Sequence, residues 1–267
     1  MKDTKIISVV NFKGGVGKST ITYNLGAELN RLGYSVLLID FDGQGTLTKF
    51  TGIEKEHEVS ANLITILKKT ISNEEINEAP IYEITPGFDI IPCDISKEGW
   101  SNSALSVLAR ETILKRAIRS INVIGKYDYV LIDNAPSINL DLQNSLVASD
   151  YYLLVTEPES ASTDGTNTVF SIIAEIKRIF NLDLNIAGIV INKVDMRTNL
   201  HFGIVDVIKR LWGDENYIFN NYIPKSIVAP ESQYMHIPIC DHEPKSKIAD
   251  AFRGLTMEFV ERTTKEG

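Results

Sequence analysis

The chain has 267 residues, 43% of them hydrophobic, and this is enough for one sizeable α/β core. Its formal net charge of −8 means that the overall field of the protein does not attract nucleic acid, so DNA binding would need a local basic patch. The two cysteines, Cys93 and Cys240, show no metal-ligand spacing and fit a reducing cytoplasm. Because no apolar run could cross a bilayer and no flexible linker divides the chain, we expect a single domain over residues 1–267.

The first predicted elements are a strand, a glycine-rich loop and a helix. Residues 6–10 are an apolar run typical of a buried parallel strand, and residues 11–20 read NFKGGVGKST. A helical pattern with one apolar face continues over residues 21–32. This order predicts a phosphate-binding loop, because glycines let successive N–H groups point at an anion and the helix adds the positive end of its dipole. The alternative, a flexible glycine turn, would need this pattern and its flanks to coincide by chance.

The loop supplies candidate nucleotide-binding and metal-binding groups. Lys18 can reach the β- and γ-phosphates of a nucleotide, and the Ser19 hydroxyl suits Mg²⁺. Phe12 stands where the usual G-x-x-x-x-G-K-[ST] pattern has its first glycine, and the residue types alone would make Lys13 a solvated surface lysine. The expected nucleotide-binding residues of the loop are Gly14, Gly15, Val16, Gly17, Lys18, Ser19 and Thr20.

Acidic residues follow two further predicted strands. The strand over residues 35–40 ends in Asp40, with Asp42 two positions on, and the strand over residues 126–133 ends in Asp133. The carboxyl ends of strands form the edge where open α/β sheets bind ligands, and acids there can support Mg²⁺ through its water shell or orient an attacking water. The alternative for each acid is a solvated residue in a turn at the end of a strand.

The other predicted elements alternate between helices and strands. They are a helix over 62–69, hairpin strands over 82–85 and 88–92, a long amphipathic helix over 104–124, strands over 151–158 and 184–192, and a helix over 166–180. This alternation predicts a mainly parallel twisted sheet with helices on both faces. The basic residues of the 104–124 helix are expected to form a solvated face rather than a DNA site.

The glycine loop resembles the deviant Walker A motif of the ParA/MinD family of P-loop ATPases. In that family the additional lysine reaches the nucleotide of the partner subunit, so the resemblance implies an ATP-dependent sandwich dimer with Lys13 acting in trans. The segment that begins at Asp40 is similar to the family's D-x-D-P-Q-G-N motif, which implies that Asp42 positions or activates the hydrolytic water. The implied catalytic residues are Lys13, Lys18 and Asp42, and the implied metal-site residues are Ser19, Asp40 and Asp133.

The C-terminal third resembles the ParA partition branch of the family. Asn192 ends a strand where ParA-like ATPases place an adenine contact, although Asn also commonly caps turns. Residues 223–232 resemble the family's segment I-P-R-N-V-R-L-S-E-A-P-S. The resemblance adds Pro224 to the implied nucleotide site. Lys225 keeps the first basic position of that segment, whereas Val228 stands at the second basic position. The implied DNA-binding residues are Lys225, Lys245, Lys247 and Arg253. The alternative is that these are solvated charges near the last helix.

The resemblance as a whole implies a cytoplasmic, nucleoid-associated partition ATPase of the short form, without an N-terminal helix-turn-helix. It would use ATP and Mg²⁺, bind DNA non-specifically as an ATP-bound homodimer, and have its hydrolysis stimulated by a ParB-like centromere-binding protein. The alternative is a MinD-like ATPase that positions cellular machinery at a membrane or other surface. That branch ends in a basic amphipathic helix, and the acids of residues 255–267 argue against membrane docking here.

Overall fold

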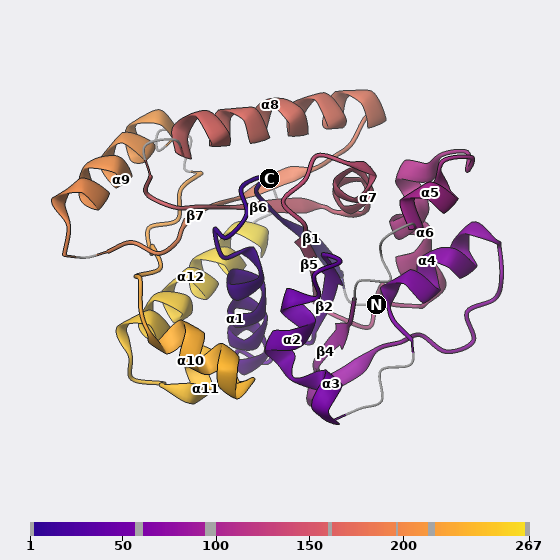
Figure 1. Ribbon diagram of the computed structural model, residues 1–267, viewed down its shortest axis with the longest axis horizontal. Coiled ribbons are helices and arrows are strands. Elements are labelled where there is room, and N and C mark those ends of the chain that lie inside the picture. The colour runs from indigo at the N-terminus through magenta and orange to yellow at the C-terminus, as the bar shows by residue number, and fades with distance from the viewer. Residues whose placement is uncertain are drawn as a thin grey trace.

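The computed structural model describes residues 3–56, 61–93, 100–159, 162–195, 197–212 and 217–264. In this part of the chain, seven strands form one sheet at the centre of the protein (Figure 1). They are β1 (Lys5–Val10), β2 (Val36–Phe41), β3 (Tyr82–Thr85), β4 (Phe88–Ile91), β5 (Tyr129–Asn134), β6 (Tyr151–Thr156) and β7 (Asn185–Ile191). The strand order is β3-β4-β2-β5-β1-β6-β7, and every neighbouring pair is parallel except the hairpin of β3 and β4. The prediction of a mainly parallel sheet is therefore confirmed.

The central strands are buried along nearly their whole length. Every residue of β2 and β5 is buried, as is every residue of β1 after Lys5. Continuous apolar sequences of this kind are typical of parallel strands that helices cover on both faces. In the register of β2 and β5, Asp40 lies opposite Asp133, so the two predicted acids meet at the carboxyl edge of the sheet.

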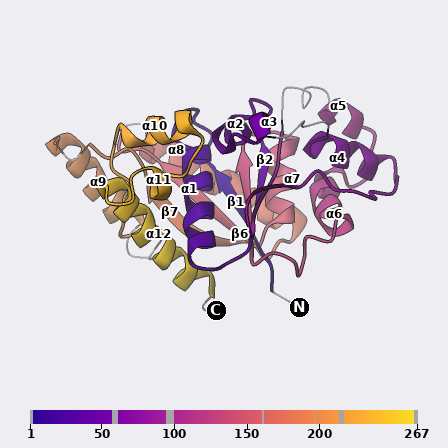
Figure 2. The same cartoon turned by 90° about the horizontal axis from the view of Figure 1, so that it is seen from below.

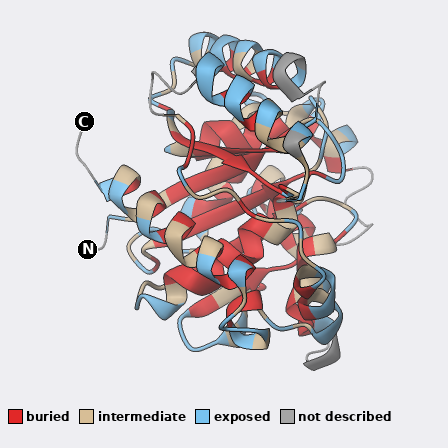
Figure 3. Cartoon of the chain, turned by 90° about the vertical axis from the view of Figure 1, so that its left-hand side faces the viewer, coloured by how far each residue is buried: buried red, intermediate tan, exposed pale blue. Residues whose placement is uncertain are grey.

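Helices cover both faces of the sheet, and their outer surfaces are exposed (Figure 3). Those of the first half are α1 (Lys18–Arg31), α2 (Thr46–Thr51), α3 (Ile53–Glu56), α4 (Leu63–Ile71), α5 (Trp100–Ala104), the 3₁₀ helix η2 (Arg110–Thr112) and α6 (Ile113–Ser120). Those of the second half are α7 (Leu140–Ala148), α8 (Ser162–Phe180), α9 (Asn199–Trp212), α10 (Val228–Met235), α11 (Ile239–His242) and α12 (Lys247–Thr264). None of these helices has the length and apolar character needed to span a bilayer, among the residues that the structure describes.

The alternation of side chains along β1 divides the core into two layers. Ile7 and Val9 pack with apolar residues of α1 and α12, whereas Ile6 packs on the opposite face with residues of α4 and α6. On that second face, Val10 extends the core toward α7, α8 and α9. Figure 2 shows α2 and α10 together at one edge of the sheet and the C-terminal end of α12 at the opposite edge.

The prediction of one long helix over residues 104–124 is wrong. Helix α5 ends at Ala104, and Ala109 has a left-handed backbone with φ of 53°, which breaks any continuous helix before α6 begins at Ile113. The side chain of Asn144 in α7 explains the new start, because its Oδ1 accepts a hydrogen bond of 3.0 Å from the backbone N–H of Leu114. A contact between residues 30 positions apart therefore ends a periodicity that looks continuous in the sequence.

Candidate functional site

A pocket of about 700 Å³ opens at the carboxyl edge of the sheet, beside the glycine loop. It is enclosed by the loop with the first turn of α1, by the segments that follow β2, β5, β6 and β7, and by parts of α2, α10 and α12 with the segment that leads into α10. Its lining residues are Gly15, Gly17, Lys18, Ser19, Thr20, Asp42, Thr46, Phe50, Pro136, Glu157, Asn192, Lys193, Ile223, Pro224, Lys225, Ser226, Ala229, Pro230, Gln233 and Ile248. The pocket thus joins the predicted phosphate loop to the segment predicted to contact adenine.

The glycine loop has the backbone that an anion cradle requires. Gly15 and Gly17 have φ of 80° and 91°, which side-chain-bearing residues rarely adopt. A Cβ atom on Gly17 would also lie 2.2 Å from Nδ2 of Asn192, so no larger residue fits there. Helix α1 follows directly, and no side chain caps its N-terminus. The first N–H groups of α1 are therefore available to a bound anion, which the helix dipole also favours.

Lys18 lies at the start of α1 and is only 7% exposed. Burial lowers the pKa of its ammonium group, and the nearby charges of Asp133 and Asp42 partly oppose this effect. A buried cation facing a pocket of this size is suited to an anionic ligand, because the ligand would replace the hydration that the lysine has lost. This position agrees with the predicted phosphate contact.

Asp133, at the end of β5, is fully buried and has one oxygen, Oδ2, without a hydrogen-bond partner. The Ser19 hydroxyl donates to its carboxylate, and the Thr22 hydroxyl lies 3.5 Å from Oδ1. Burial raises the pKa of Asp133 to about 8, and the charge of Asp40 adds to the increase. An orphaned carboxylate oxygen behind Ser19 is what a Mg²⁺ ion with its water shell would satisfy, so these residues fit a magnesium site.

Asp40 is engaged by its own loop. Its Oδ2 accepts hydrogen bonds from the backbone N–H and the hydroxyl of Thr48, at 2.9 and 2.7 Å, and its Oδ1 accepts one from the N–H of Asp42 at 3.1 Å. Burial raises the pKa of Asp40 to about 6, although these hydrogen bonds lower it. The geometry therefore supports Asp40 as the residue that fixes the loop carrying Asp42. Asp42 itself is half-buried and lines the pocket.

Within the described ranges, no group of three or more His, Cys, Asp or Glu side chains could hold a metal ion on its own. A magnesium ion at this site would therefore need oxygen atoms from water and from a bound nucleotide. This requirement matches the usual behaviour of Mg²⁺, which keeps several waters and binds one or two protein groups together with phosphates.

Lys13, the additional lysine of the loop, lies outside the pocket lining. Its Nζ is 2.5 Å from Oε2 of Glu159, and both side chains are 49% exposed. The hydrogen bond to Glu159 raises the pKa of Lys13 and lowers that of the glutamate. Within one chain the lysine is thus paired with an acid, and nothing in this arrangement directs it at its own pocket.

The predicted adenine end of the pocket is built by Asn192 and Pro224. Asn192 is 3% exposed, and its Nδ2 donates a 2.8 Å hydrogen bond to the carbonyl of Val16. Pro224 lines the pocket and forms a parallel bridge with Val194. The side chain of Gln233 in α10 reaches across and donates to the Thr20 hydroxyl at 2.9 Å. The amide of Asn192 therefore fastens the glycine loop, whichever ligand the pocket takes.

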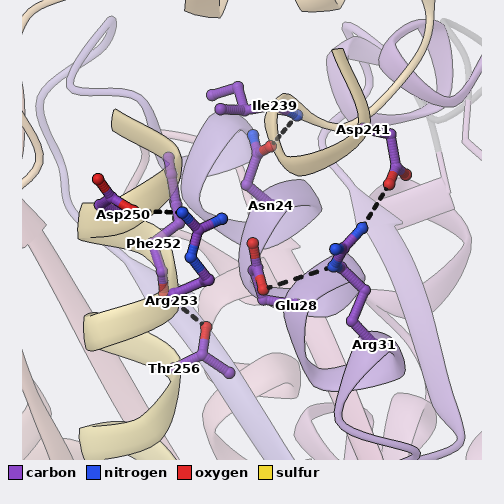
Figure 4. A network of polar contacts seen from close by, with 9 residues as sticks. All are labelled: Asn24, Glu28, Arg31, Ile239, Asp241, Asp250, Phe252, Arg253 and Thr256. Atoms are coloured by element: carbon purple, nitrogen blue, oxygen red, sulfur yellow. Dashed lines mark hydrogen bonds and ion pairs between the residues drawn. The ribbon is translucent and has the colours of Figure 1, made fainter. Parts of the chain in front are cut away.

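The four predicted DNA-binding residues occupy different settings. Lys225 is exposed and lines the pocket, and Lys247 is exposed at the start of α12, next to Ile248 of the same pocket lining. Lys245 is exposed two residues before α12. Arg253 forms an ion pair with Asp250 within α12 and is drawn beside the α1 residue Glu28 in Figure 4. Lys225 and Lys247 are therefore the better candidates for a shared surface.

Sequence reasoning missed four groups that the fold brings to the loop: Glu157, Glu159, Lys193 and Gln233. The two glutamates follow β6 and the lysine follows β7, and both strands end beside the glycine loop. For Glu159 and Lys193, their position after predicted strands was the available signal. Their pairing was not readable, because each contact joins residues far apart in the sequence.

Comparison with known proteins agrees with this geometry. Residues 4–186 match the AAA domain family. The chain is 33% identical to the sporulation initiation inhibitor protein Soj of Bacillus subtilis, over 96% of this chain and 98% of Soj. It is 28% identical to the chromosome partitioning protein ParA of Caulobacter vibrioides, over 97% and 94% of the two chains.

Among solved structures, the septum site-determining protein MinD of Pyrococcus horikoshii, complexed with Mg-ADP, aligns with a TM-score of 0.76 and 26% identity. The alignment covers 98% of each chain. Together with the glycine loop and the sheet order, these matches show that the chain belongs to the AAA domain family and, within it, to the ParA/MinD group of P-loop ATPases.

Proposed function

We propose that this protein is a Mg²⁺-dependent ATPase that segregates plasmid or chromosomal DNA, working in the cytoplasm on the nucleoid. The observation that carries the proposal is the pocket lined by the glycine loop and the buried Lys18, with the orphaned oxygen of Asp133 behind Ser19. The resemblance to Soj and ParA over nearly the whole chain supports a partition role, and the Mg-ADP of the MinD structure supports the cofactors.

In this proposal the loop and α1 bind the phosphates of ATP through backbone N–H groups, and Lys18 neutralises the charge on the β- and γ-phosphates. Ser19 and Asp133 hold Mg²⁺, which would neutralise the charge that develops on the phosphate oxygens. Asp42 orients the attacking water, while Asp40 keeps the Asp42 loop in place through Thr48. Phosphoryl transfer to water then depends mainly on positioning and electrostatics.

Asp42→Ala tests the hydrolytic part of the proposal. The variant should bind ATP with nearly the parental affinity and release phosphate on the order of 100-fold more slowly, as is typical when a general base or water-positioning group is lost. Nucleotide affinity and steady-state phosphate release, measured on the same preparation, separate the two effects. A normal rate of phosphate release would assign the water to another residue.

The DNA surface would form when ATP joins two subunits, because the net charge of −8 argues against binding by a uniform field. Lys225 and Lys247 of both subunits would then meet phosphates of any duplex, with a partner resembling ParB stimulating hydrolysis and release. Binding of this kind depends little on sequence and falls steeply with salt.

The test is to titrate two unrelated duplexes with ATP, ADP or no nucleotide, at several salt concentrations. We expect binding with ATP only, and weaker binding with a flatter salt dependence for Lys225→Glu and Lys247→Glu. Unchanged binding in both variants would place the surface elsewhere. If the parental protein with ATP binds vesicles of anionic lipid and no DNA, the MinD-like alternative replaces the partition role. The structure argues against that outcome, because Leu255 and Phe259 of α12 are buried in the core and cannot contact lipid.

A further inference from the structure

Lys193, which follows Asn192 after the end of β7, is bound to the outside of the glycine loop. Its Nζ donates a short hydrogen bond to the carbonyl of Gly15 and lies 2.7 Å from Oε1 of Glu157. The backbone of Lys193 is left-handed, with φ of 55°, a conformation that costs energy for a residue with a side chain and that clusters at functional sites. Both Lys193 and Glu157 line the pocket.

Two consecutive residues thereby hold two consecutive carbonyls of the loop. Lys193 binds the carbonyl of Gly15, and Asn192 binds the carbonyl of Val16 at 2.8 Å. In a trans peptide the C=O and N–H groups point in opposite directions. Fixing these two carbonyls therefore also fixes the N–H groups of Val16 and Gly17, which point away from Asn192 and Lys193.

The pairing with Glu157 explains why the lysine holds this position. The Glu157 side chain is 13% exposed, so its charge is poorly hydrated and its attraction for the ammonium is weakly screened. Lys193 carries two partners on one ammonium group, a carbonyl of the loop and a carboxylate that follows β6. The end of β6, the end of β7 and the glycine loop are thus linked through a single side chain.

We propose that Lys193 is a positioning residue for the phosphates of the bound nucleotide, acting through the peptide between Gly15 and Val16, with Glu157 as its anchor. The proposal rests on the proposed nucleotide-binding function and adds to it a residue outside the loop. Lys193 contributes its effect before the ligand arrives, because a loop whose peptides are already held in place loses less entropy on binding. Removal of the ammonium should therefore weaken phosphate binding without weakening the binding of a nucleoside.

The test compares Lys193→Met, Lys193→Arg and Glu157→Gln, with Lys68→Met, at an exposed position of α4, as the matched control. Affinities for ADP with Mg²⁺ and for adenosine are measured by competition against a fluorescent ADP analogue. We expect Lys193→Met to bind ADP about tenfold more weakly, equivalent to about 1.4 kcal/mol, with the affinity for adenosine unchanged. Lys193→Arg should recover most of the loss, Glu157→Gln should show a smaller one, and Lys68→Met should match the parent.

Thermal unfolding without nucleotide shows whether each variant is folded. An affinity of Lys193→Met for ADP equal to that of the parent, or equal losses for ADP and adenosine, would overturn the proposal. If Lys193→Met does not fold, the Glu157→Gln variant tests the proposal instead. A folded Glu157→Gln protein with the parental affinity for ADP would contradict the anchoring role of Glu157. A parental protein that binds neither ADP nor ATP would instead contradict the proposed function, which is a separate result.

Discussion

In the part of the chain that the structure describes, two regions bury a carboxylate that has one unpaired oxygen, and the two regions differ in what surrounds it. Asp133 lies behind the glycine loop, where its Oδ2 has no partner, and Ser19 and Lys18 separate it from the pocket. Glu28 lies in the middle of α1, where its Oε1 has no partner, and α11 and α12 pack over it (Figure 4). Both pKa values are raised by burial.

The cations near each acid separate the two regions further. Lys18 is itself buried and faces an open pocket, whereas Arg31 lies 4.0 Å from Glu28 and also pairs with Asp241 at 2.7 Å on the surface. Near the loop, one oxygen of Asp133 has no partner, and the buried Lys18 lines a space of about 700 Å³. In the helix contact, Glu28 is not among the residues that line this pocket. An unpaired buried oxygen therefore points to a ligand only where a cavity and a complementary charge accompany it.

The largest effect that this comparison predicts is at Lys18. Lys18→Met should lower the affinity for ATP on the order of 100-fold, because a buried ammonium group shared by two phosphates makes more than one charge-assisted hydrogen bond. Calorimetry of ATP binding measures the loss, and Lys68→Met serves as the control. Unchanged affinity would mean that the buried lysine is structural, and the two regions would then be of the same kind.

Substitution of Lys13 should have the next largest effect, and it should change dimerisation rather than the affinity for ATP. Lys13→Gln should bind ATP and remain a monomer, since the family resemblance directs this lysine to the partner's nucleotide. Glu159→Gln should have the opposite effect and dimerise at a lower protein concentration, because it removes the acid that now pairs with Lys13. Light scattering with ATP measures both, and equal dimerisation of the parent and Lys13→Gln would make Lys13 a surface residue.

Asp133→Asn should change binding and stability in opposite directions. The amide keeps the size of the side chain and cannot carry the charge that burial opposes, so the nucleotide-free variant should melt no lower than the parent. Its affinity for ATP with Mg²⁺ should fall about tenfold, since the amide supports the metal less well. Differential scanning calorimetry and ATP titrations with Mg²⁺ or EDTA provide the two measurements. A lower melting temperature with full affinity would show that Asp133 serves the fold and not the site.

The elements of this fold differ in how far local sequence determines them. The glycine loop, β5 with Asp133 and the 82–91 hairpin were predictable, because glycine positions and apolar runs specify them over a few residues. The break between α5 and α6 was not, because Asn144 in a distant helix caps the new start. Likewise, the partners of Lys13 and Lys193 lie 146 and 178 positions away along the chain, and only the parallel sheet brings them together.

Substitution of Glu28 should have the smallest effect of these changes. It tests the second region of the comparison, the contact of α1 with α11 and α12. Burial raises the pKa of Glu28 in the folded protein above its ordinary value of 4.5, and the charge of Asp241 adds to the increase. The charges of Arg31 and Arg253 and a hydrogen bond from Cys240 lower this pKa and so oppose part of the increase. The native state therefore binds more protons than the unfolded chain just above pH 4.5, so the free energy of unfolding should fall as the pH rises through that window.

Glu28→Gln cannot titrate, so the variant should lack this decrease and differ from the parent by about 1 kcal/mol or less at pH 4.5. Urea unfolding between pH 4.5 and 7.5 measures it, with the exposed helical variant Glu175→Gln as the control. Affinity for ATP should be unchanged, because Glu28 does not line the pocket. A parallel pH dependence in Glu28→Gln and the parent would show that the acid is ionised within the helix contact. Burial beside Arg31 would then be sufficient to keep a carboxylate charged, and the orphaned oxygen of Asp133 would lose its value as a sign of a ligand.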